Sequence, residues 1–237
     1  MPAGRGRLVV FDVTGTLLTP AGSVGAVYAD AARAAGGAFE AATLDTAFGR
    51  ALGAAPPLAF GHLGPGDREA AERDWWRGVA RSALGALPPA FGFDPFFDRV
   101  WRHFSEPRAW RVYPEVRLAL RALRRTGHPL AVLSNWDSRL PPLLEALRLG
   151  GYFARVLVSS ALPAAKPDPA AFAAATTALD GVGNGVPIMV GDRLDHDVLP
   201  ARAAGWDAVW LDRRGDAAPP GIARVTDLRD LARDEGA

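Results

Sequence analysis

Short runs of consecutive apolar residues recur along the chain, one near its beginning and the others in its second half. Runs of this length that do not alternate with polar residues are typical of parallel β-strands, because helices cover both faces of such a sheet. We therefore predict buried strands at Leu8–Phe11, Leu130–Leu133, Arg155–Val158, Ile188–Val190 and Ala208–Leu211.

Helical sequence lies between these strands. The segment Pro114–Arg125 has a proline in its first turn, where a helix tolerates one. A second helix is predicted over Leu140–Leu149, which two glycines follow. A third is predicted over Ala170–Leu179, where Asp168 and Pro169 combine a capping side chain with a proline at the first helical position. This alternation predicts an α/β fold with a doubly wound, Rossmann-like parallel sheet.

The pattern changes between residues 20 and 110, where strand-like runs are missing. Glycine and proline clusters separate four helical stretches there, namely Val24–Ala35, Ala41–Leu52, Asp67–Leu84 and Asp94–Phe104. We therefore predict a core domain of residues 1–19 and 111–237, with a helical domain of residues 20–110 inserted after the first strand. A short final helix is expected over Asp227–Arg233.

Composition adds one informative residue. The chain has 27 basic residues, and only Lys166, inside Ala-Lys-Pro-Asp-Pro, is a lysine. The abundance of alanine, glycine, proline and arginine suggests a bias that turns ordinary lysines into arginines. We therefore interpret the remaining lysine as one kept for its compact, mobile charge, which a planar guanidinium cannot copy.

The totals exclude several classes of protein. A formal net charge of +1 argues against nucleic acid or a membrane surface as the main partner. The chain has no cysteine, so disulfides, thiol catalysis and cysteine-ligated zinc are excluded, and its four histidines show no metal-binding spacing. The first apolar run is too short for a signal peptide, and no segment approaches the length of a membrane span. We expect a cytoplasmic protein.

Four polar clusters follow predicted strands. Ligands of a parallel sheet bind outside the carboxyl ends of its strands, so we expect these clusters to converge. In the first, Asp12-Val13-Thr14-Gly15-Thr16, an aspartate leaves a buried strand into a tight turn. An exposed carboxylate there can attack phosphorus as a nucleophile. The alternative interpretation is an aspartate that caps a loop.

The second and third clusters offer groups that bind anions. Ser134 ends an apolar strand, and its hydroxyl and the backbone N–H groups that follow can donate hydrogen bonds to a phosphate oxygen. A cap for the next helix is the alternative. The third is Lys166, whose ammonium can neutralise the nucleophile and a phosphoryl oxygen together.

The fourth cluster contains two acids five residues apart, Asp192 and Asp197, directly after a strand that ends in Val190-Gly191. Clustered carboxylates need a counter-ion or a raised pKa. Hard oxygen ligands without a cysteine or histidine pattern suit Mg²⁺, which binds through carboxylates, waters and phosphate oxygens. The alternative is a solvated acidic turn.

In this order, the four motifs resemble those of the haloacid dehalogenase superfamily of phosphohydrolases. The first is similar to the family's Asp-x-Asp/Thr-Gly-Thr, the second to its Ser/Thr, the third to its Lys-Pro and the last to its Gly-Asp-x-x-x-x-Asp. The resemblance covers nearly the whole chain, and the insert lies where the family has its four-helix cap. The Ser-Asn-Trp-Asp stretch looks most like the branch called haloacid dehalogenase-like hydrolase domain-containing protein 3.

The resemblance implies a Mg²⁺ site and a nucleophile. Asp12 would be the nucleophile and a metal ligand. The backbone carbonyl of Thr14 would be the second ligand and Asp192 the third. Asp197 would ligate through water or orient Lys166.

The resemblance also implies how the substrate is held. Ser134, the neighbouring amide at Asn135 and Lys166 would hold the transferring phosphoryl group, together with the turn at Thr14 and Gly15. The reaction would be hydrolysis of a phosphomonoester, a small phosphorylated metabolite, through an aspartyl-phosphate. Positioning and charge neutralisation would supply most of the rate, and the cap would choose the substrate.

One position departs from the family pattern. Most phosphatases of this family have an aspartate two residues after the nucleophile, which protonates the leaving group and later activates water. This chain has Thr14 there, and a threonine cannot act as a general acid or base near neutral pH. Ion pumps that form an aspartyl-phosphate also carry a threonine at this position, and this resemblance implies that aspartyl phosphorylation survives and that hydrolysis is slow unless another group helps. Asp137 and His196 are candidate substitutes.

Two alternatives from other classes remain. In haloacid dehalogenation Asp12 would attack carbon without a metal; Ser134-Asn135 fits this chemistry, but two further acids without a cation would repel an anionic substrate. A weakly active or non-catalytic phosphate-binding relative is suggested by Thr14. Retention of Asp12, Lys166 and Asp192 argues against it. Phosphonate cleavage through a cap lysine is excluded, because the insert contains no lysine.

Overall fold

The computed structural model describes residues 6–215 and 219–232 of the chain. These residues belong to two compact units. Unit 1 comprises residues 1–19, 58–64 and 112–237, and unit 2 comprises residues 20–57 and 65–111. The chain passes between the units near two short strands that pair with each other, β2 (Leu18–Pro20) and β3 (Trp110–Val112).

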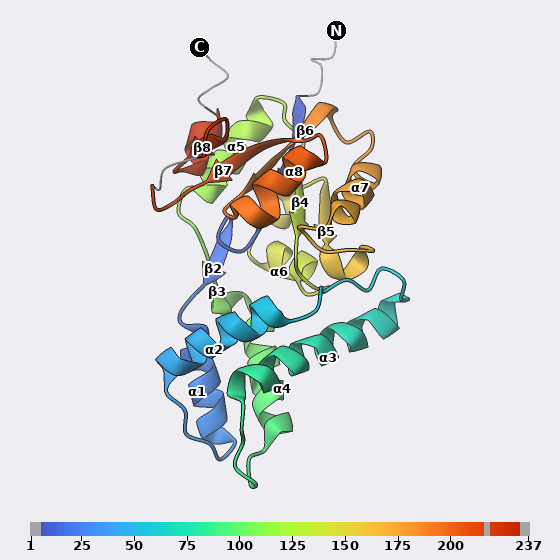
Figure 1. Cartoon of the computed structure of the whole chain (residues 1–237). Helices are drawn as coiled ribbons and strands as arrows, with labels where there is room; N and C mark the ends of the chain where they lie inside the picture. Colours follow the sequence, from blue (N-terminus) through green and yellow to red (C-terminus); the bar gives the residue numbers. More distant parts are fainter. Residues whose placement is uncertain (1–5, 216–218, 233–237) are drawn as a thin grey trace. The chain divides into compact units, whose positions relative to one another are not determined.

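The centre of unit 1 is a parallel sheet, which confirms the predicted fold class (Figure 1). Among the described residues it has six strands in the order β5-β4-β1-β6-β7-β8. Their bounds are Arg7–Phe11 for β1, Leu130–Ser134 for β4, Arg155–Val158 for β5, Asn184–Gly191 for β6, Asp207–Leu211 for β7 and Ala223–Val225 for β8. The pattern of apolar runs did not indicate β8, because its three residues include an exposed arginine.

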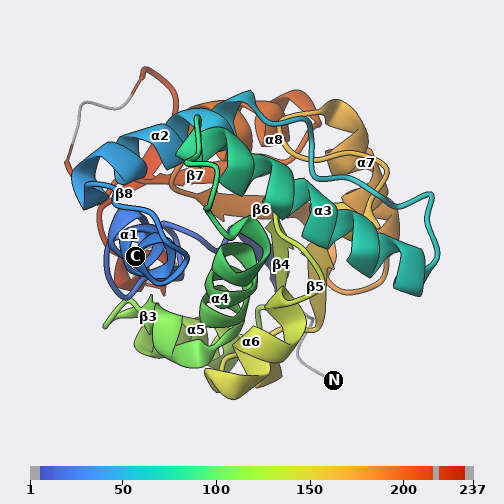
Figure 2. The ribbon, with the colours of Figure 1, turned by 90° about the horizontal axis from the view of Figure 1, so that it is seen from below.

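Helices cover both faces of this sheet, which is why its strands are continuously apolar. Figure 2 shows α5 and α6 on one face and α7 and α8 on the other. Val10 in β1 packs in one buried cluster with Phe172 of α7, and its neighbour Phe11, which points to the opposite face, is also fully buried. The helices span Val116–Arg125 (α5), Leu140–Ala146 (α6), Pro169–Ala178 (α7) and Leu199–Ala203 (α8).

Two predicted helices end differently in the structure. The helix predicted over Leu140–Leu149 stops at Ala146, and a short 3₁₀ turn, η2 (Gly150–Tyr152), follows a three-residue link. The helix predicted over Asp227–Arg233 is a 3₁₀ turn, η5 (Leu228–Ala232), and Arg233 lies outside the described residues.

Unit 2 is helical. Its four α-helices lie at the predicted positions, with bounds Val24–Ala34 (α1), Ala41–Ala54 (α2), Pro65–Leu84 (α3) and Phe93–Ser105 (α4), and a 3₁₀ turn, η1 (Pro107–Ala109), follows them. Aromatic side chains form much of its core, as in the edge-to-face pair of Tyr28 and Phe96, whose ring centroids lie 5.4 Å apart.

Residues 58–64 differ from the expected arrangement, because they fall within the predicted insert but belong to unit 1. Backbone hydrogen bonds explain this. The N–H of Phe60 donates to the carbonyl of Ser160 over 3.0 Å, and that of Gly61 donates to the carbonyl of Leu162 over 3.0 Å. Both acceptors lie at η3 (Ser159–Ala161), the turn after β5, or just beyond it. No periodic pattern in the sequence indicates these backbone hydrogen bonds.

Candidate active site

Asp12 lies directly after the central strand β1, which β4 and β6 flank on either side. Its backbone N–H donates to the carbonyl of Val190 over 2.9 Å, so the pairing with β6 continues to this residue. The hydroxyl of Ser134, the last residue of β4, donates to Asp12 Oδ1 over 3.0 Å. Two of the predicted motifs therefore meet at one carboxylate.

Lys166 joins two more motifs. Its Nζ donates to Asp12 Oδ1 over 2.9 Å and to Asp197 Oδ1 over 2.6 Å. The lysine is only 4% exposed, so its charge has almost no access to solvent and these two carboxylates neutralise it. A buried ammonium held between two acids fits the interpretation of the single lysine as a residue kept for its charge.

Asn135 holds this lysine in place. Its Nδ2 donates to the carbonyl of Lys166 over 2.7 Å, and its Oδ1 accepts from the N–H of Lys166 over 2.9 Å. Both ends of the side-chain amide are thus engaged by one backbone residue. The Asn135 side chain therefore holds the backbone of Lys166.

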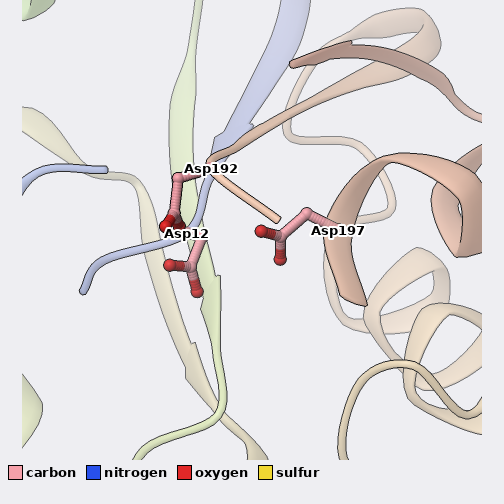
Figure 3. Close-up of side chains that lie close together, drawn as sticks. All are labelled: Asp12, Asp192 and Asp197. Atoms are coloured by element: carbon pink, nitrogen blue, oxygen red, sulfur yellow. The ribbon is translucent and has the colours of Figure 1, made fainter. Parts of the chain in front are cut away.

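Three carboxylates gather at this edge of the sheet, as Figure 3 shows for Asp12, Asp192 and Asp197. One oxygen from each lies within 4.8 Å of the others. Asp192 Oδ1 accepts from Thr16 Oγ1 over 3.4 Å, and Asp197 Oδ2 accepts from the N–H of Arg193 over 3.0 Å. Asp197 lies in a single π-helical turn, η4 (Leu194–Val198), which aims its side chain back toward Lys166.

Two glycines make this close approach possible. Gly15 has φ +90°, and a Cβ there would overlap the carboxylate of Asp192. A Cβ at Gly191 would overlap the carboxylate of Asp197. The glycines of the first and fourth motifs are therefore required because acidic side chains press against their backbones.

The charges of the cluster do not balance. Burial raises the pKa of Asp12, and the charge of Asp197 raises it further against the opposing effect of Lys166. Burial, with the charges of Asp12 and Asp197, raises the pKa of Asp192 to about 7. Burial alone would lower the pKa of Lys166, but its two carboxylate partners outweigh it and raise that pKa. Three acids share one ammonium, and the excess is negative.

This cluster can hold a divalent metal ion. It offers only oxygen ligands, which hard cations such as Mg²⁺ prefer. A divalent cation would also remove the excess negative charge. The turn after Asp12 offers one more oxygen, the carbonyl of Thr14. The carbonyls of Val13, Gly15 and Thr16 all accept hydrogen bonds, but no described residue donates a hydrogen bond to that of Thr14.

The raised pKa of Asp192 predicts how Mg²⁺ and pH interact. Its pKa rises from about 3.8 to about 7 on folding, so the metal-free protein is expected to lose stability as pH rises from 4 to 7. A proton at Asp192 competes with the metal, so apparent Mg²⁺ affinity is expected to rise about tenfold per pH unit below 7. Thermal unfolding with and without Mg²⁺ measures both. Equal Mg²⁺-induced shifts at pH 6 and pH 8, or the same pH dependence in Asp192→Asn, would contradict the prediction.

The two candidate substitutes for a general acid each lie beside another charged side chain. Asp137 is fully buried and pairs with Arg139 through two contacts, of 2.7 Å from Nη2 and 2.9 Å from Nε. This ion pair commits its carboxylate to the arginine. His196 Nδ1 lies 3.1 Å from Asp195 Oδ2. Thr14 itself is exposed beside Asp12, in the turn where the family's aspartate would stand.

Two residues at the site carried no motif and were missed in the sequence. Both come from β7 or the residues just after it. Trp210 Nε1 donates to the backbone carbonyl of Asp192 over 3.0 Å. Arg213 donates to the backbone carbonyls of Gly15 and Thr16. Their only sequence signal is their place at the carboxyl end of a strand in the same sheet.

In the part of the chain that the structure describes, no helix combines the length and the apolar character needed to cross a membrane.

Comparison with known proteins identifies the family that the motifs resemble. The family model for "haloacid dehalogenase-like hydrolase" matches residues 7–205. The chain is 36% identical over 168 residues to Haloacid dehalogenase-like hydrolase domain-containing protein 3 of Mus musculus, covering 70% of this chain and 66% of that protein. It is 32% identical to Phosphoserine phosphatase of Thermus thermophilus over 260 residues, covering 95% of this chain and 97% of that protein.

A solved structure points to the other chemistry found among these relatives. The 2-haloacid dehalogenase from Pseudomonas syringae is similar to this chain with a TM-score of 0.63 and 25% identity, covering 98% of this chain and 100% of that chain. Names of both kinds, phosphatase and dehalogenase, therefore occur among similar proteins, and the residues of the site have to separate them.

Proposed function

The chain belongs to the family of haloacid dehalogenase-like hydrolases, as its motifs predicted, and we propose that it is a Mg²⁺-dependent phosphomonoester hydrolase that works through an aspartyl-phosphate on Asp12. The observation that carries this proposal is the group formed by Asp12, Asp192 and Asp197 around one buried ammonium. Its excess negative charge calls for a cation before any anionic substrate can enter.

The proposed reaction has two displacements at phosphorus. A carboxylate oxygen of Asp12 attacks the phosphorus, the bond to the ester oxygen breaks, and the ester oxygen leaves as an anion that takes its proton from solvent. Water then attacks the aspartyl-phosphate, which releases inorganic phosphate and restores the carboxylate. Atoms and charges balance without an oxidant or reductant.

Each residue of the site has a definite task in this scheme. Asp12, Asp192 and the carbonyl of Thr14 would hold Mg²⁺, which when bound neutralises charge on the phosphoryl oxygens. Lys166 and the hydroxyl of Ser134 both contact Asp12 Oδ1, so they keep its carboxylate in one orientation and can share a phosphoryl oxygen with it. Asp197 holds the ammonium from the other side, over 2.6 Å.

The same charges disfavour dehalogenation. A 2-haloacid brings a carboxylate to the site, and without a metal it would meet Asp192 and Asp197 in addition to the nucleophile. Asn135, which fits dehalogenase chemistry in the sequence, has its side-chain amide bonded to Lys166 instead. Small phosphorylated metabolites are the proposed substrates, and we propose that the helices of unit 2 determine which of them react.

Phosphate release from a broad panel of small phosphomonoesters tests the proposal. Release is expected with Mg²⁺, to stop with a chelator and to return when Mg²⁺ is restored. Halide release from 2-haloacids is measured on the same protein without metal and is expected to be absent. Halide release that is independent of metal would establish the dehalogenase. If neither phosphate nor halide is released, a phosphate-binding relative is favoured. Mg²⁺-dependent binding of inorganic phosphate would then be expected.

A further inference from the structure

Arg213, just after β7, contacts the turn that follows Asp12 through its guanidinium. Its Nε donates to the carbonyl of Gly15 over 3.0 Å, and its Nη2 donates to the carbonyl of Thr16 over 2.7 Å. Its Nη1 forms an ion pair with Glu115 Oε1 at 2.5 Å. All three nitrogens of one planar guanidinium are therefore used, and two of them hold the turn that follows Asp12.

The surroundings of the guanidinium keep it in this position. It lies over the ring of Tyr113, with its Cζ 3.7 Å from the ring centroid. Tyr113 also donates its backbone N–H to the carbonyl of Leu17 over 3.2 Å, so residues 113–115 hold the same turn directly and through the arginine. The Glu115 side chain is 8% exposed and that of Arg213 is 23% exposed, which separates this pair from an exposed surface ion pair of little value.

The remaining hydrogen bonds of the turn show what Arg213 controls. The carbonyl of Val13 accepts from the N–H groups of Thr16, Leu17 and Leu18, and Gly15 donates to the carbonyl of Leu18 over 2.7 Å. These bonds close the turn on itself. Arg213 donates to the two carbonyls that follow Thr14, and no described residue donates a hydrogen bond to the carbonyl of Thr14.

We propose that Arg213 is a positioning residue for the proposed hydrolase: by holding the carbonyls of Gly15 and Thr16, it fixes the turn that presents the Asp12 carboxylate and the Thr14 carbonyl to a divalent cation. The inference rests on the proposed function for its effect on turnover. Repulsion among the three carboxylates favours opening of the turn, and the guanidinium opposes it. Arginine suits this task because its fork reaches two carbonyls and a carboxylate at once, which a lysine cannot do.

The test compares Arg213→Met and Arg213→Lys with a matched control, Arg117→Met. Arg117 also donates to two backbone carbonyls of unit 1, those of Leu147 and Arg148, but away from the site. Calorimetric titration of each protein with Mg²⁺ alone measures affinity without turnover, and phosphate release at saturating Mg²⁺ gives kcat and KM. Thermal unfolding reports any general loss of stability.

For Arg213→Met we expect Mg²⁺ affinity and kcat each to fall by about 10- to 100-fold, the usual effect of removing a group that orients metal ligands, with little change in KM. Arg213→Lys is expected to recover part of the loss, and Arg117→Met to show none. A Mg²⁺ affinity in Arg213→Met within about twofold of that in Arg117→Met would overturn the proposal. If the wild-type protein releases no phosphate, the proposed hydrolase activity fails, and the Mg²⁺ titration still decides the role of Arg213.

Discussion

Asp12→Asn is expected to reduce Mg²⁺-dependent phosphate release by about 10⁴-fold or more, the scale of losing a covalent nucleophile. An amide keeps the shape of the side chain and its bond from Ser134, but its nitrogen and oxygen are too weakly nucleophilic to attack phosphorus. Acid quenching after incubation with a labelled phosphomonoester is expected to leave label on the wild-type protein and none on the variant. The measurement therefore separates loss of the covalent step from loss of binding.

The variant is expected to fold normally. Lys166 keeps Asp197 as a partner at 2.6 Å, and removal of one charge relieves the excess of acid in the metal-free cluster. The matched control is Asp207→Asn, because Asp207 lies at the opposite, amino end of β7 and pairs with Arg7 there. Both variants lose one carboxylate from unit 1, and only Asp12→Asn is expected to lose activity. Residual labelling of Asp12→Asn would mean that another residue is the nucleophile.

The sequence was sufficient to predict which motifs meet because their positions follow from local rules. Asp12, Ser134 and Asp192 each follow a short apolar run, and parallel strands bring their carboxyl ends to one edge of the sheet. Lys166 stood out by composition alone. The excess of negative charge among the acids could be predicted as well. The motifs contain no second lysine to balance the carboxylates, and no cysteine or histidine pattern that would indicate another kind of metal site.

Other parts of the site depend on distances that no local pattern records. The Asn135 side chain could face substrate or the lysine loop, and only the fold shows that it bonds to Lys166. Arg213 is one of 26 arginines, and its role follows from the place where β7 ends beside the turn at Gly15. Residues 58–64 join unit 1 through backbone hydrogen bonds, which leave no periodic side-chain pattern in the sequence. In each case the information lies in tertiary contacts.

The Asp192 carboxylate connects these two kinds of result. Its sequence spacing predicts a metal ligand, and its raised pKa of about 7 arises only when burial brings it beside Asp12 and Asp197. Three clustered carboxylates beside one ammonium are stable together only if a bound proton or cation neutralises the excess negative charge. A proton does so at low pH and a divalent cation at neutral pH. The same imbalance makes the bracing of the turn by Arg213 useful.

Thr14→Asp is expected to speed hydrolysis by about 10²-fold or more, because general acid–base help is typically worth about 10²–10⁴-fold. Thr14 is exposed, two residues after Asp12, so an aspartate there adds a group that can protonate the leaving oxygen and then activate water at little cost in packing. Without that group, the wild-type protein must release each alcohol unaided. It is therefore expected to favour aryl phosphates, whose leaving groups are stable anions, over alkyl phosphates.

The dependence on the leaving group gives this prediction its sharpest form. In Thr14→Asp the rates for alkyl phosphates are expected to rise far more than those for aryl phosphates. The ratio of the aryl rate to the alkyl rate is therefore expected to fall. Thr14→Asn is the matched control, because an amide has the same shape as the carboxylic acid but cannot supply a proton. A gain seen equally in Thr14→Asp and Thr14→Asn would point to a steric effect of the turn. If neither variant is faster and the leaving-group preference is unchanged, proton transfer does not limit turnover. The threonine at position 14 would then cost this site no activity.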